Sequence, residues 1–386
     1  MVELYAAWAS GAVAVPINTR LAAPEARFIL EDLAAPVASD AQDCVILYTS
    51  GTTGRPKGAV NTHANVLVQN VEQHAGAWGI GEDDRFLVTT PLAHRAGMAR
   101  LVNALGLGGT LVIMESFDAA AALELVEREA STVAGLPPTV IRLMLPEMRR
   151  NPERLASLRT VVVSTEAFPA PLMREVAALL PRAQFHAVYG MSEAAVSSAS
   201  LAEQLARPGT VGRPLPGVAV RISADQELLV RGENAVMRGY FNRPEDNAEA
   251  FRGGWFHTGD LARSDDEGYL YIIDRKKDMV LTGGYNVYCK EVEQALAQHP
   301  DIADAAVIGL PDPVYGEAVA AFIELRRGAE LTAEAIGAHC ANLLAGYKKP
   351  RIVHFVEALP RNSVGKVLKQ ELRRFFYNSL AQRGNL

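Results

Sequence analysis

The stretch YTSGTTGRPKGA, residues 48–59, concentrates glycines, hydroxyl side chains and two cations in a dozen positions. Glycine lets the main chain approach an anion closely, hydroxyls donate hydrogen bonds, and lysine adds a charge-assisted bond that is about twice as strong as a neutral one. A strand-like apolar run at 43–50 leads straight into it. We therefore predict a phosphate-binding loop. Its candidate ligand-binding residues are Thr49, Ser50, Gly51, Thr52, Thr53, Gly54 and Lys57.

The spacing of this loop differs from the commoner catalytic motifs. Counted from Gly51, the pattern GxxxxGK[ST] would require a glycine where Pro56 stands, and Gly58 follows Lys57 instead of preceding it. The chain has no GxGxxG at LGLGGTL and no GxSxG turn. Walker-type kinases, dinucleotide-dependent dehydrogenases and serine hydrolases therefore lack their signatures. A glycine-rich surface turn is the alternative for SGTTG alone, but the preceding strand and the following RPKG favour phosphate binding.

Six further stretches accompany the loop along the chain. They are PLAHRAG (91–97), YGMSE (189–193), RGY (238–240), WFHTGD (255–260), DRKKDMVLTGGYNV (274–287) and PRNSVGK (360–366). In these residues and in their order, the sequence resembles the adenylate-forming superfamily, which includes acyl-CoA synthetases, adenylation domains of peptide synthetases and luciferase. The resemblance covers nearly the whole chain.

The resemblance implies how a nucleotide is bound. The opening loop would hold the β- and γ-phosphates of ATP. In YGMSE, Tyr189 would stack on adenine beside Gly190, Ser192 would lie next to the α-phosphate where the family usually has threonine, and Glu193 would bind Mg²⁺, a hard cation that prefers oxygen ligands. Taken alone, Glu193 would more often be a solvated carboxylate.

Two further residues would bracket the ribose, because Asp260 would accept from its hydroxyls and Arg275 would support that carboxylate. Taken alone, Asp260 would more often be a turn residue.

Other positions would act in catalysis and domain rotation. Lys366 would stabilise the charge that spreads over the α-phosphate in the transition state, where a cation acts more strongly than in the ground state. His94 would lie between the acyl-carboxylate site and the thiol tunnel, with a helix cap or core histidine as the alternative. Lys277 would be the hinge, although a charged linker would look the same. Gly283 and Gly284 would let a pantetheine arm pass.

Three features depart from the family pattern. Thr165 and Glu166 stand where a glycine pair is usual, and a buried carboxylate there would need a partner. Arg95 is a less usual neighbour of His94. We expect it to face solvent, and if it faced the pocket instead it would suit an acidic acyl tail. The N-terminal subdomain looks shortened both before residue 3 and between LEDLAAP and DCVILYTS, which would leave an apolar surface for a second subunit, as in a homodimer.

The expected function is ATP- and Mg²⁺-dependent activation of a carboxylic acid as acyl-adenylate, with transfer to coenzyme A. One alternative is an adenylation enzyme that loads a separate carrier protein, since the chain has no carrier-like serine motif of its own. A catalytically silent nucleotide-binding homologue is the other. The sequence does not identify the carboxylic acid.

Composition narrows the classes of protein that remain possible. The chain has 386 residues, 49% of them hydrophobic and 21% charged, and a net charge of −6, which disfavours a nucleic-acid binder. Cys44, Cys289 and Cys340 form neither a disulfide framework nor a zinc spacing, so we expect buried thiols. No apolar run is long enough for a membrane span, and Glu3 stands where a secretion signal usually carries a positive charge. We therefore expect a cytoplasmic protein.

The elements that must position these residues alternate between strand and helix up to about residue 190. We expect an α/β fold: a large adenylation core at 1–276, with mostly parallel sheets covered by helices plus a small β-barrel-like part, and a small mobile α+β domain at 277–386. The phosphate loop is expected to join a strand to the helix at 63–79, and a short strand is expected at 11–17.

Overall fold

The computed structural model describes residues 2–19, 21–34, 42–49, 56–166, 168–361 and 367–382. The chain divides into two compact units, Met1–Thr258 with Arg263–Ile272, and Gly259–Ala262 with Ile273–Leu386. The chain crosses between them within strands β13 (Phe256–Ser264) and β14 (Leu270–Arg275). The domain boundary expected at 276/277 stays a prediction.

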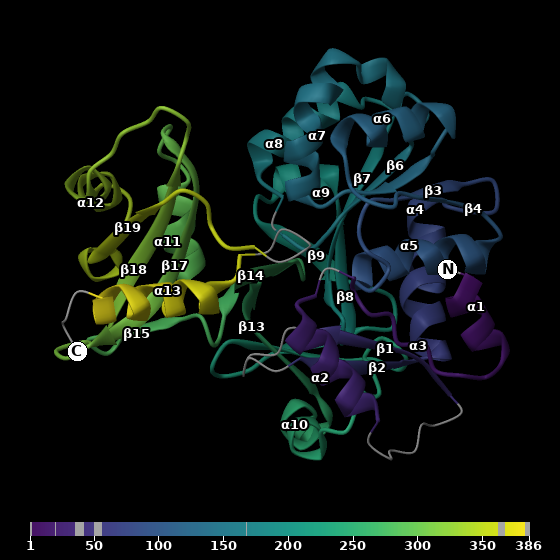
Figure 1. The fold of residues 1–386 in the computed structure, drawn as a ribbon, viewed down its shortest axis with the longest axis horizontal. Helices are drawn as coiled ribbons and strands as arrows, with labels where there is room; N and C mark the ends of the chain where they lie inside the picture. Colours follow the sequence, from purple (N-terminus) through teal and green to yellow (C-terminus); the bar gives the residue numbers. More distant parts are fainter. Residues whose placement is uncertain are drawn as a thin grey trace. The chain divides into compact units, whose positions relative to one another are not determined.

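A mixed sheet of eleven strands dominates the described residues, in the order β10-β11-β13-β14-β9-β8-β7-β6-β5-β3-β4 (Figure 1). Five neighbouring strands are parallel, as the alternating pattern predicts: β3 (Arg85–Val88), β4 (Thr110–Ile113), β5 (Val133–Gly135), β6 (Thr160–Val163) and β7 (Gln184–Met191). The remaining strands are β8 (Ala194–Ser200), β9 (Thr210–Pro214), β10 (Ala219–Ile222) and β11 (Glu227–Arg231), with β13 and β14. The pairs β7–β8, β8–β9, β9–β14 and β10–β11 are antiparallel.

Helices cover both faces of the parallel strands (Figure 1). On one face lie α6 (Ala119–Arg128), α7 (Pro138–Arg150) and α8 (Ala170–Leu179), and on the other lie α4 (Gln73–Trp78) and α5 (Arg95–Leu107). Successive residues of these strands face opposite sides of the sheet. Ala134 and Val161 pack under α6 and α7, whereas Val133 and Val162 pack with Trp78 on the other side. Burial on both faces explains why these strands read as continuous apolar runs.

The phosphate loop joins two antiparallel strands, which corrects the expected strand–loop–helix arrangement. β1 (Asp43–Thr49) pairs with β2 (Lys57–Thr62), and β2 also pairs with β12 (Gly239–Tyr240). Gly58 makes this pairing close, because a Cβ there would lie 2.7 Å from Ile46 Cγ2. Helix α3 (His63–Leu67) begins after β2, with Thr62 accepting from the Asn65 backbone N–H as a cap, and continues through a π-helical turn, η1 (Val68–Glu72), into α4.

The strand expected at 11–17 is also wrong. Between α1 (Val2–Ala9) and α2 (Ala23–Leu33), Ala14 forms a single bridge to Val45 of β1. The two short helices further along are α9 (Leu201–Ala206) and α10 (Pro244–Ala250). Residues 35–41 lie outside the described residues, and the shortened N-terminal subdomain stays a prediction.

The smaller unit is the expected α+β structure. Its sheet has the order β16-β15-β18-β17, with β19 parallel to β18. The strands are β15 (Val280–Thr282), β16 (Tyr285–Val287), β17 (Ile302–Asp312), β18 (Gly316–Leu325) and β19 (Ile352–Val356). The helices are α11 (Cys289–Leu296), α12 (Ala333–Ala341) and α13 (Lys369–Gln382).

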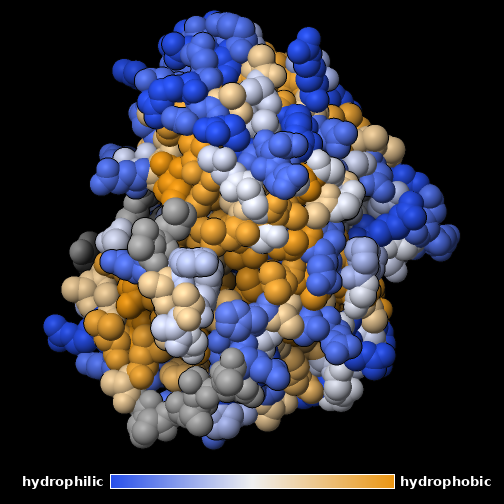
Figure 2. Space-filling model, turned by 90° about the vertical axis from the view of Figure 1, so that its right-hand side faces the viewer, coloured by the Kyte–Doolittle hydropathy of each residue, from blue (hydrophilic) through white to orange (hydrophobic). Residues whose placement is uncertain are grey.

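Hydrophobic side chains gather on the side of the larger unit that carries α1, α3, α5 and β4 (Figure 2). The exposed large apolar side chains of these elements are Tyr5, Leu67, Leu105 and Ile113, which we call the apolar face. The sequence led us to expect an apolar surface for a second subunit without locating it, and the homodimer stays a prediction.

The cysteines are buried and free, as predicted, and burial raises the pKa of the Cys44 thiol to about 12. Within the described part of the chain, no helix is both long and apolar enough to cross a membrane.

Candidate active site

The two ends of the predicted phosphate loop lie side by side. Thr49, the last residue of β1, pairs with Lys57, the first residue of β2, and Thr49 Oγ1 donates to the Lys57 carbonyl at 3.4 Å. The rest of the predicted loop set falls outside the described residues, namely Ser50, Gly51, Thr52, Thr53 and Gly54. The hairpin therefore brings Thr49 and Lys57 together at the mouth of the loop.

Lys57 and the predicted metal ligand Glu193 meet at one tyrosine. Lys57 Nζ lies 5.3 Å from the centroid of the Tyr240 ring, and the Tyr240 hydroxyl donates to Glu193 Oε1 at 2.9 Å. Lys57 Nζ also pairs with Asp246 Oδ1 at 2.5 Å, with both side chains partly buried. Sequence reasoning missed Asp246 and gave Tyr240 no role. The motif RGY marked Tyr240, but no spacing signal pointed to Asp246 on α10.

Glu193 occupies the tip of a tight hairpin. Met191 of β7 pairs with Ala194 of β8, so Ser192 and Glu193 form a two-residue turn. The turn is tied to its neighbours through its main chain, because Asn61 Nδ2 donates to the Ser192 carbonyl at 3.2 Å and the Met237 N–H donates to the Glu193 carbonyl at 2.6 Å. These bonds fix the main chain of Glu193, and the Tyr240 hydroxyl orients its carboxylate.

Tyr189 and Gly190 precede this turn at the irregular end of β7. Tyr189 is half-buried and pairs with Ser197, and the register shifts between Tyr189 and Gly190. A Cβ on Gly190 would lie 2.7 Å from the Ala194 carbonyl oxygen, so the close approach of β8 itself requires glycine there. The predicted adenine contact of Tyr189 stays a prediction.

His94 caps helix α5. Its Nδ1 accepts from the Ala96 N–H at 3.3 Å, which is the capping role that sequence analysis left open as an alternative. The expectation that Arg95 faces solvent is wrong, since its side chain is partly buried and donates to Asn70 Oδ1 at 2.9 Å. The first turn of α5 packs against η1, and that packing turns Arg95 inward.

Glu166 has the partner that its position demands. Its carboxylate accepts from the Thr139 hydroxyl at 2.5 Å and pairs with Arg142 at 3.3 Å, both on α7. Thr165 has a φ of 77°, a left-handed conformation that is strained for a β-branched residue. Thr165 therefore adopts a conformation that suits the glycine expected there from the family pattern.

The ribose pair is formed within the smaller unit. Arg275 Nε lies 3.0 Å from Asp260 Oδ1, and Asp260 is buried. The predicted hinge residue Lys277 is exposed in the turn that follows β14. Gly283 and Gly284 form the two-residue tip between β15 and β16, with φ values of 56° and 82°, so the hairpin alone already requires glycines.

The predicted catalytic residue Lys366 lies outside the described residues. Its role therefore stays a prediction.

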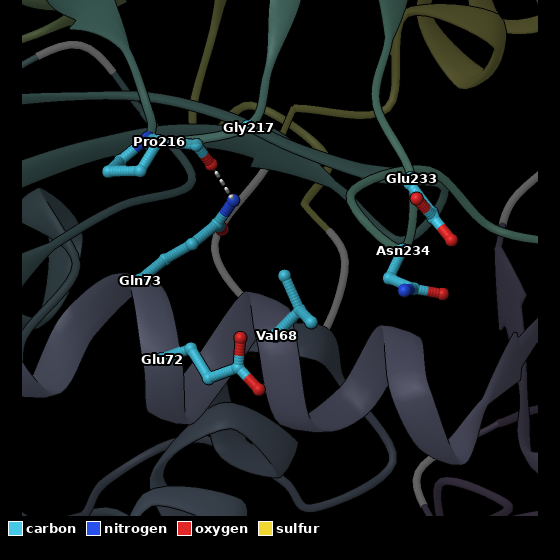
Figure 3. A pocket seen from close by; sticks show the side chains of 7 residues that line it. All are labelled: Val68, Glu72, Gln73, Pro216, Gly217, Glu233 and Asn234. Carbon is cyan, nitrogen blue, oxygen red and sulfur yellow. Dashed lines mark hydrogen bonds between the residues drawn. The ribbon is translucent and has the colours of Figure 1, made fainter.

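A cavity of about 450 Å³ lies elsewhere on the larger unit, between η1 and the loops after β9 and β11 (Figure 3). Gln73 Nε2 donates to the Pro216 carbonyl at 2.9 Å at its edge, and Glu72 and Glu233 line it. Another cavity, of about 340 Å³, is lined by Tyr240, Arg238 and Arg243 and lies beside the Lys57–Tyr240 contact. The second cavity, unlike the first, adjoins residues assigned to nucleotide binding.

Comparison with known proteins identifies the family of the chain. Residues 33–241 match the family described as AMP-binding enzyme, and residues 291–366 match the AMP-binding enzyme C-terminal domain. The chain is 36% identical to a feruloyl-CoA synthase from Amycolatopsis sp., over 97% of this chain and 86% of that protein.

Two solved structures of o-succinylbenzoate CoA synthetase (MenE) from Bacillus subtilis are similar in fold at 30% identity. One is a complex with the acyl-adenylate intermediate OSB-AMP, with a TM-score of 0.85, covering 96% of this chain and 84% of that one. The other is a complex with ATP and magnesium ion, also with a TM-score of 0.85, covering 96% of this chain and 86% of that one.

Proposed function

Because this chain belongs to the AMP-binding enzyme family, we propose that it is an AMP-forming acid–thiol ligase, which activates a carboxylic acid with ATP and Mg²⁺ and transfers the acyl group to coenzyme A. The observation that carries the proposal is the convergence of Lys57 and Glu193 on Tyr240. It links the mouth of the β1–β2 loop to the tip of the β7–β8 hairpin, where a triphosphate and its cation would be held.

The residues at this point suit magnesium. Mg²⁺ is usually held by one or two carboxylates together with substrate phosphates, and Glu193 is a carboxylate fixed at a hairpin tip. Among the described residues no cluster of three or more acidic, histidine or cysteine side chains could hold a metal. Mg²⁺ bound by Glu193 would neutralise phosphate charge.

Five residues of the chain have separate roles in the proposed reaction. Lys57 exchanges its contact with Asp246 for a phosphate oxygen, and the hydroxyl of Thr49 donates to the same group. Asp260, oriented by Arg275, accepts from the ribose hydroxyls. The substrate carboxylate attacks the α-phosphate and releases pyrophosphate, and Lys366 stabilises the charge that develops there. The thiol of coenzyme A, losing its proton, then attacks the acyl carbon of the adenylate and displaces AMP. Positioning and electrostatics carry the rate, because the reaction requires no side-chain nucleophile.

The proposal is tested by ATP–pyrophosphate exchange with a panel of carboxylic acids, followed by thioester formation with free coenzyme A. Exchange with at least one acid and thioester formation with coenzyme A are the expected results. Exchange without thioester formation would point to a carrier protein as acceptor. Silence across the whole panel would favour a nucleotide-binding homologue and overturn the proposal.

Lys366→Ala tests the assignment of the catalytic cation. This variant should lose exchange by a factor of about a thousand, because it lacks a charge that acts in the transition state. It should still convert a supplied acyl-adenylate and coenzyme A to thioester. Normal exchange by Lys366→Ala would show that the assignment is wrong.

A further inference from the structure

A cluster of basic side chains lies buried on the α4/α5 face of the large sheet, outside the residues assigned above. Arg100 of α5 is 4% exposed and His74 of α4 is 3% exposed. The guanidinium carbon of Arg100 lies 5.4 Å from the centroid of the Trp78 ring, which stacks with His74 at 3.8 Å and with His186 of β7 at 5.4 Å. Arg95, at the start of α5, belongs to the same cluster because its charge acts on both Arg100 and His74.

Several nitrogen atoms of the cluster are buried without a hydrogen-bond partner among the described residues. They are Arg100 Nη1, Arg95 Nε and His186 Nε2. Within the part of the chain that the structure describes, no carboxylate pairs with Arg100, and Glu203 is the acidic group that acts on His186. Burial lowers the pKa of Arg100 to about 9, so its guanidinium is still charged at neutral pH. A buried cation without a hydrogen-bonded anion strongly destabilises a folded protein.

Arg100 lies at the edge of the sheet where ligands of α/β proteins bind. Its side chain passes over Gly135, where an added Cβ would lie 3.4 Å from Arg100 Cγ. Gly135 is the last residue of β5, and Thr89 Oγ1, just after β3, donates to its carbonyl at 2.8 Å. Both positions are at the carboxyl ends of parallel strands.

The proposed nucleotide residues Tyr189 and Glu193 follow the same edge, at the end of β7. Gly135 is level with Val162 of β6 and His186 of β7, so Tyr189 lies two strand spacings across the sheet and three residues further along β7, roughly 14 Å from Gly135. An acid whose reacting carboxylate meets the nucleotide near β7 could therefore extend its other end to Arg100.

We propose that Arg100 is a specificity-determining residue that binds a second carboxylate on the acid substrate, so that the preferred substrates are dicarboxylic acids. This inference rests on the proposed function for the identity of the reaction. The planar guanidinium matches a carboxylate with two parallel hydrogen bonds, and Arg95 adds a second positive charge nearby. A monocarboxylic acid of the same length would leave Arg100 unpaired.

The experiment compares matched acids on the full chain and two variants. Octanedioate, hexanedioate and benzene-1,4-dicarboxylate are each paired with the monocarboxylate of the same skeleton. Binding is measured by titration calorimetry in phosphate-free buffer, and kcat/KM by ATP–pyrophosphate exchange. The wild-type chain should prefer at least one dicarboxylate by about tenfold or more. Arg100→Met keeps the apolar stem of the side chain and removes the charge, so the preference should fall to within about twofold.

Arg85→Met is the matched control. Arg85 lies at the opposite end of β3 and pairs with Glu129 at 2.9 Å, so this variant should lose thermal stability and keep the substrate preference. Arg100→Met should instead melt at the same or a higher temperature in the absence of acid, because it removes an unpaired buried charge. Arg100→Lys retains a cation and should keep part of the preference.

The outcomes separate this inference from the proposed function. Exchange in which Arg100→Met keeps the wild-type preference between matched dicarboxylates and monocarboxylates, or in which the wild type shows no such preference, would support the ligase and overturn the role of Arg100. Dicarboxylate binding that requires Arg100, with no exchange from any acid, would support the subsite and overturn the ligase. Equal stabilisation of wild type by inorganic phosphate and by dicarboxylates, with no preference among acids, would reduce the cluster to a general anion site and overturn the inference.

Discussion

Tyr240 shows how one side chain can couple two functions at the residue scale. Its ring lies under Lys57, which is assigned to phosphate, while its hydroxyl donates to Glu193, which is assigned to magnesium. A hydrogen bond to a metal-binding carboxylate orients that carboxylate and tunes its affinity for the metal. Tyr240 is therefore a positioning residue for the proposed metal site.

Tyr240→Phe should separate these two roles. The ring under Lys57 remains, but Glu193 loses a hydrogen bond, so we expect about a tenfold rise in the Mg²⁺ concentration that gives half-maximal exchange. The dependence of ATP–pyrophosphate exchange on Mg²⁺ measures this shift. Tyr271→Phe is the control, since it removes a 2.9 Å hydrogen bond to Asp265 away from the site and should leave the Mg²⁺ dependence unchanged. An unchanged curve for Tyr240→Phe would rule out the positioning role.

His186 should make stability depend on pH. Burial lowers the pKa of His186 to about 4, against 6.5 for an exposed imidazole, and Glu203 opposes this shift. The unfolded chain therefore binds a proton between pH 6.5 and 4 that the folded chain does not, so stability is full above pH 6.5 and is lost as the pH falls toward 4. Burial lowers the pKa of His74 as well, with Arg100 and Arg95 adding to the effect, so His74 acts in the same direction.

His186→Phe keeps a ring against Trp78 and cannot be protonated. The urea midpoint of this variant, measured from pH 7 to pH 4, should fall less steeply than that of the wild-type chain. Some pH dependence should remain because of His74. Parallel curves for the two proteins would exclude His186 as a source of acid sensitivity.

At the scale of elements, the segment after β6 stores strain. Thr165 is exposed and has a φ of 77°, so its side chain contributes little packing while its backbone is strained. Thr165→Gly should raise the free energy of unfolding by about 1 kcal/mol.

Urea unfolding followed by tryptophan fluorescence is the suitable measurement, because Trp8, Trp78 and Trp255 all lie in the larger unit. Ser164→Gly is the matched control: Ser164 has no such left-handed φ, and glycine there should destabilise the unit. A lower midpoint for Thr165→Gly would mean that contacts of Thr165 outweigh its strain.

The sequence predicted elements well where one physical signal dominated. The apolar runs of β3 to β7 and the periodic helices between them were found because both faces of that sheet are buried. β2 was missed because Gly58 and the polar residue Asn61 interrupt its short apolar run, and β8 was missed because its small residues resemble a loop. Short antiparallel returns depend on pairing with distant strands, which no local pattern records.

The candidate site was predicted in a similarly uneven way. Motifs singled out Lys57, Glu193, Asp260 and Arg275. In the structure Lys57 and Glu193 both contact Tyr240, and Arg275 contacts Asp260 directly. The buried position of Arg100 could not be predicted, because an arginine on a helix is usually exposed. Its burial follows from the packing of α5 over Gly135.

At the scale of the whole molecule, the predicted site residues are divided between two compact units. Lys57, His94, Tyr189 and Glu193 belong to the larger unit, whereas Asp260, Arg275 and Lys277 belong to the smaller one. We expect the smaller unit to take a different position in each of the two proposed steps, adenylation and thiol attack. The turn after β14 is the segment at which we expect the chain to rotate between them.

Lys277→Pro tests this hinge because proline fixes φ near −65° and removes the rotation that the turn would need. Lys277 is exposed in its turn, so the substitution removes little packing. We expect one half-reaction to survive and the other to slow by at least about tenfold, since a locked hinge holds one arrangement of the units. Exchange with ATP measures the first half-reaction, and thioester formation from supplied acyl-adenylate measures the second.

Lys277→Ala is the control for this variant, because it removes the charge and leaves the backbone free to rotate. It should retain both half-reactions, as a merely charged linker would also predict. The hinge and the charged-linker interpretations of DRKKD therefore predict different results only for Lys277→Pro. If that variant folds, as judged by circular dichroism, and catalyses both half-reactions at wild-type rates, residue 277 is a linker position, and rotation of the smaller unit must occur elsewhere in the chain.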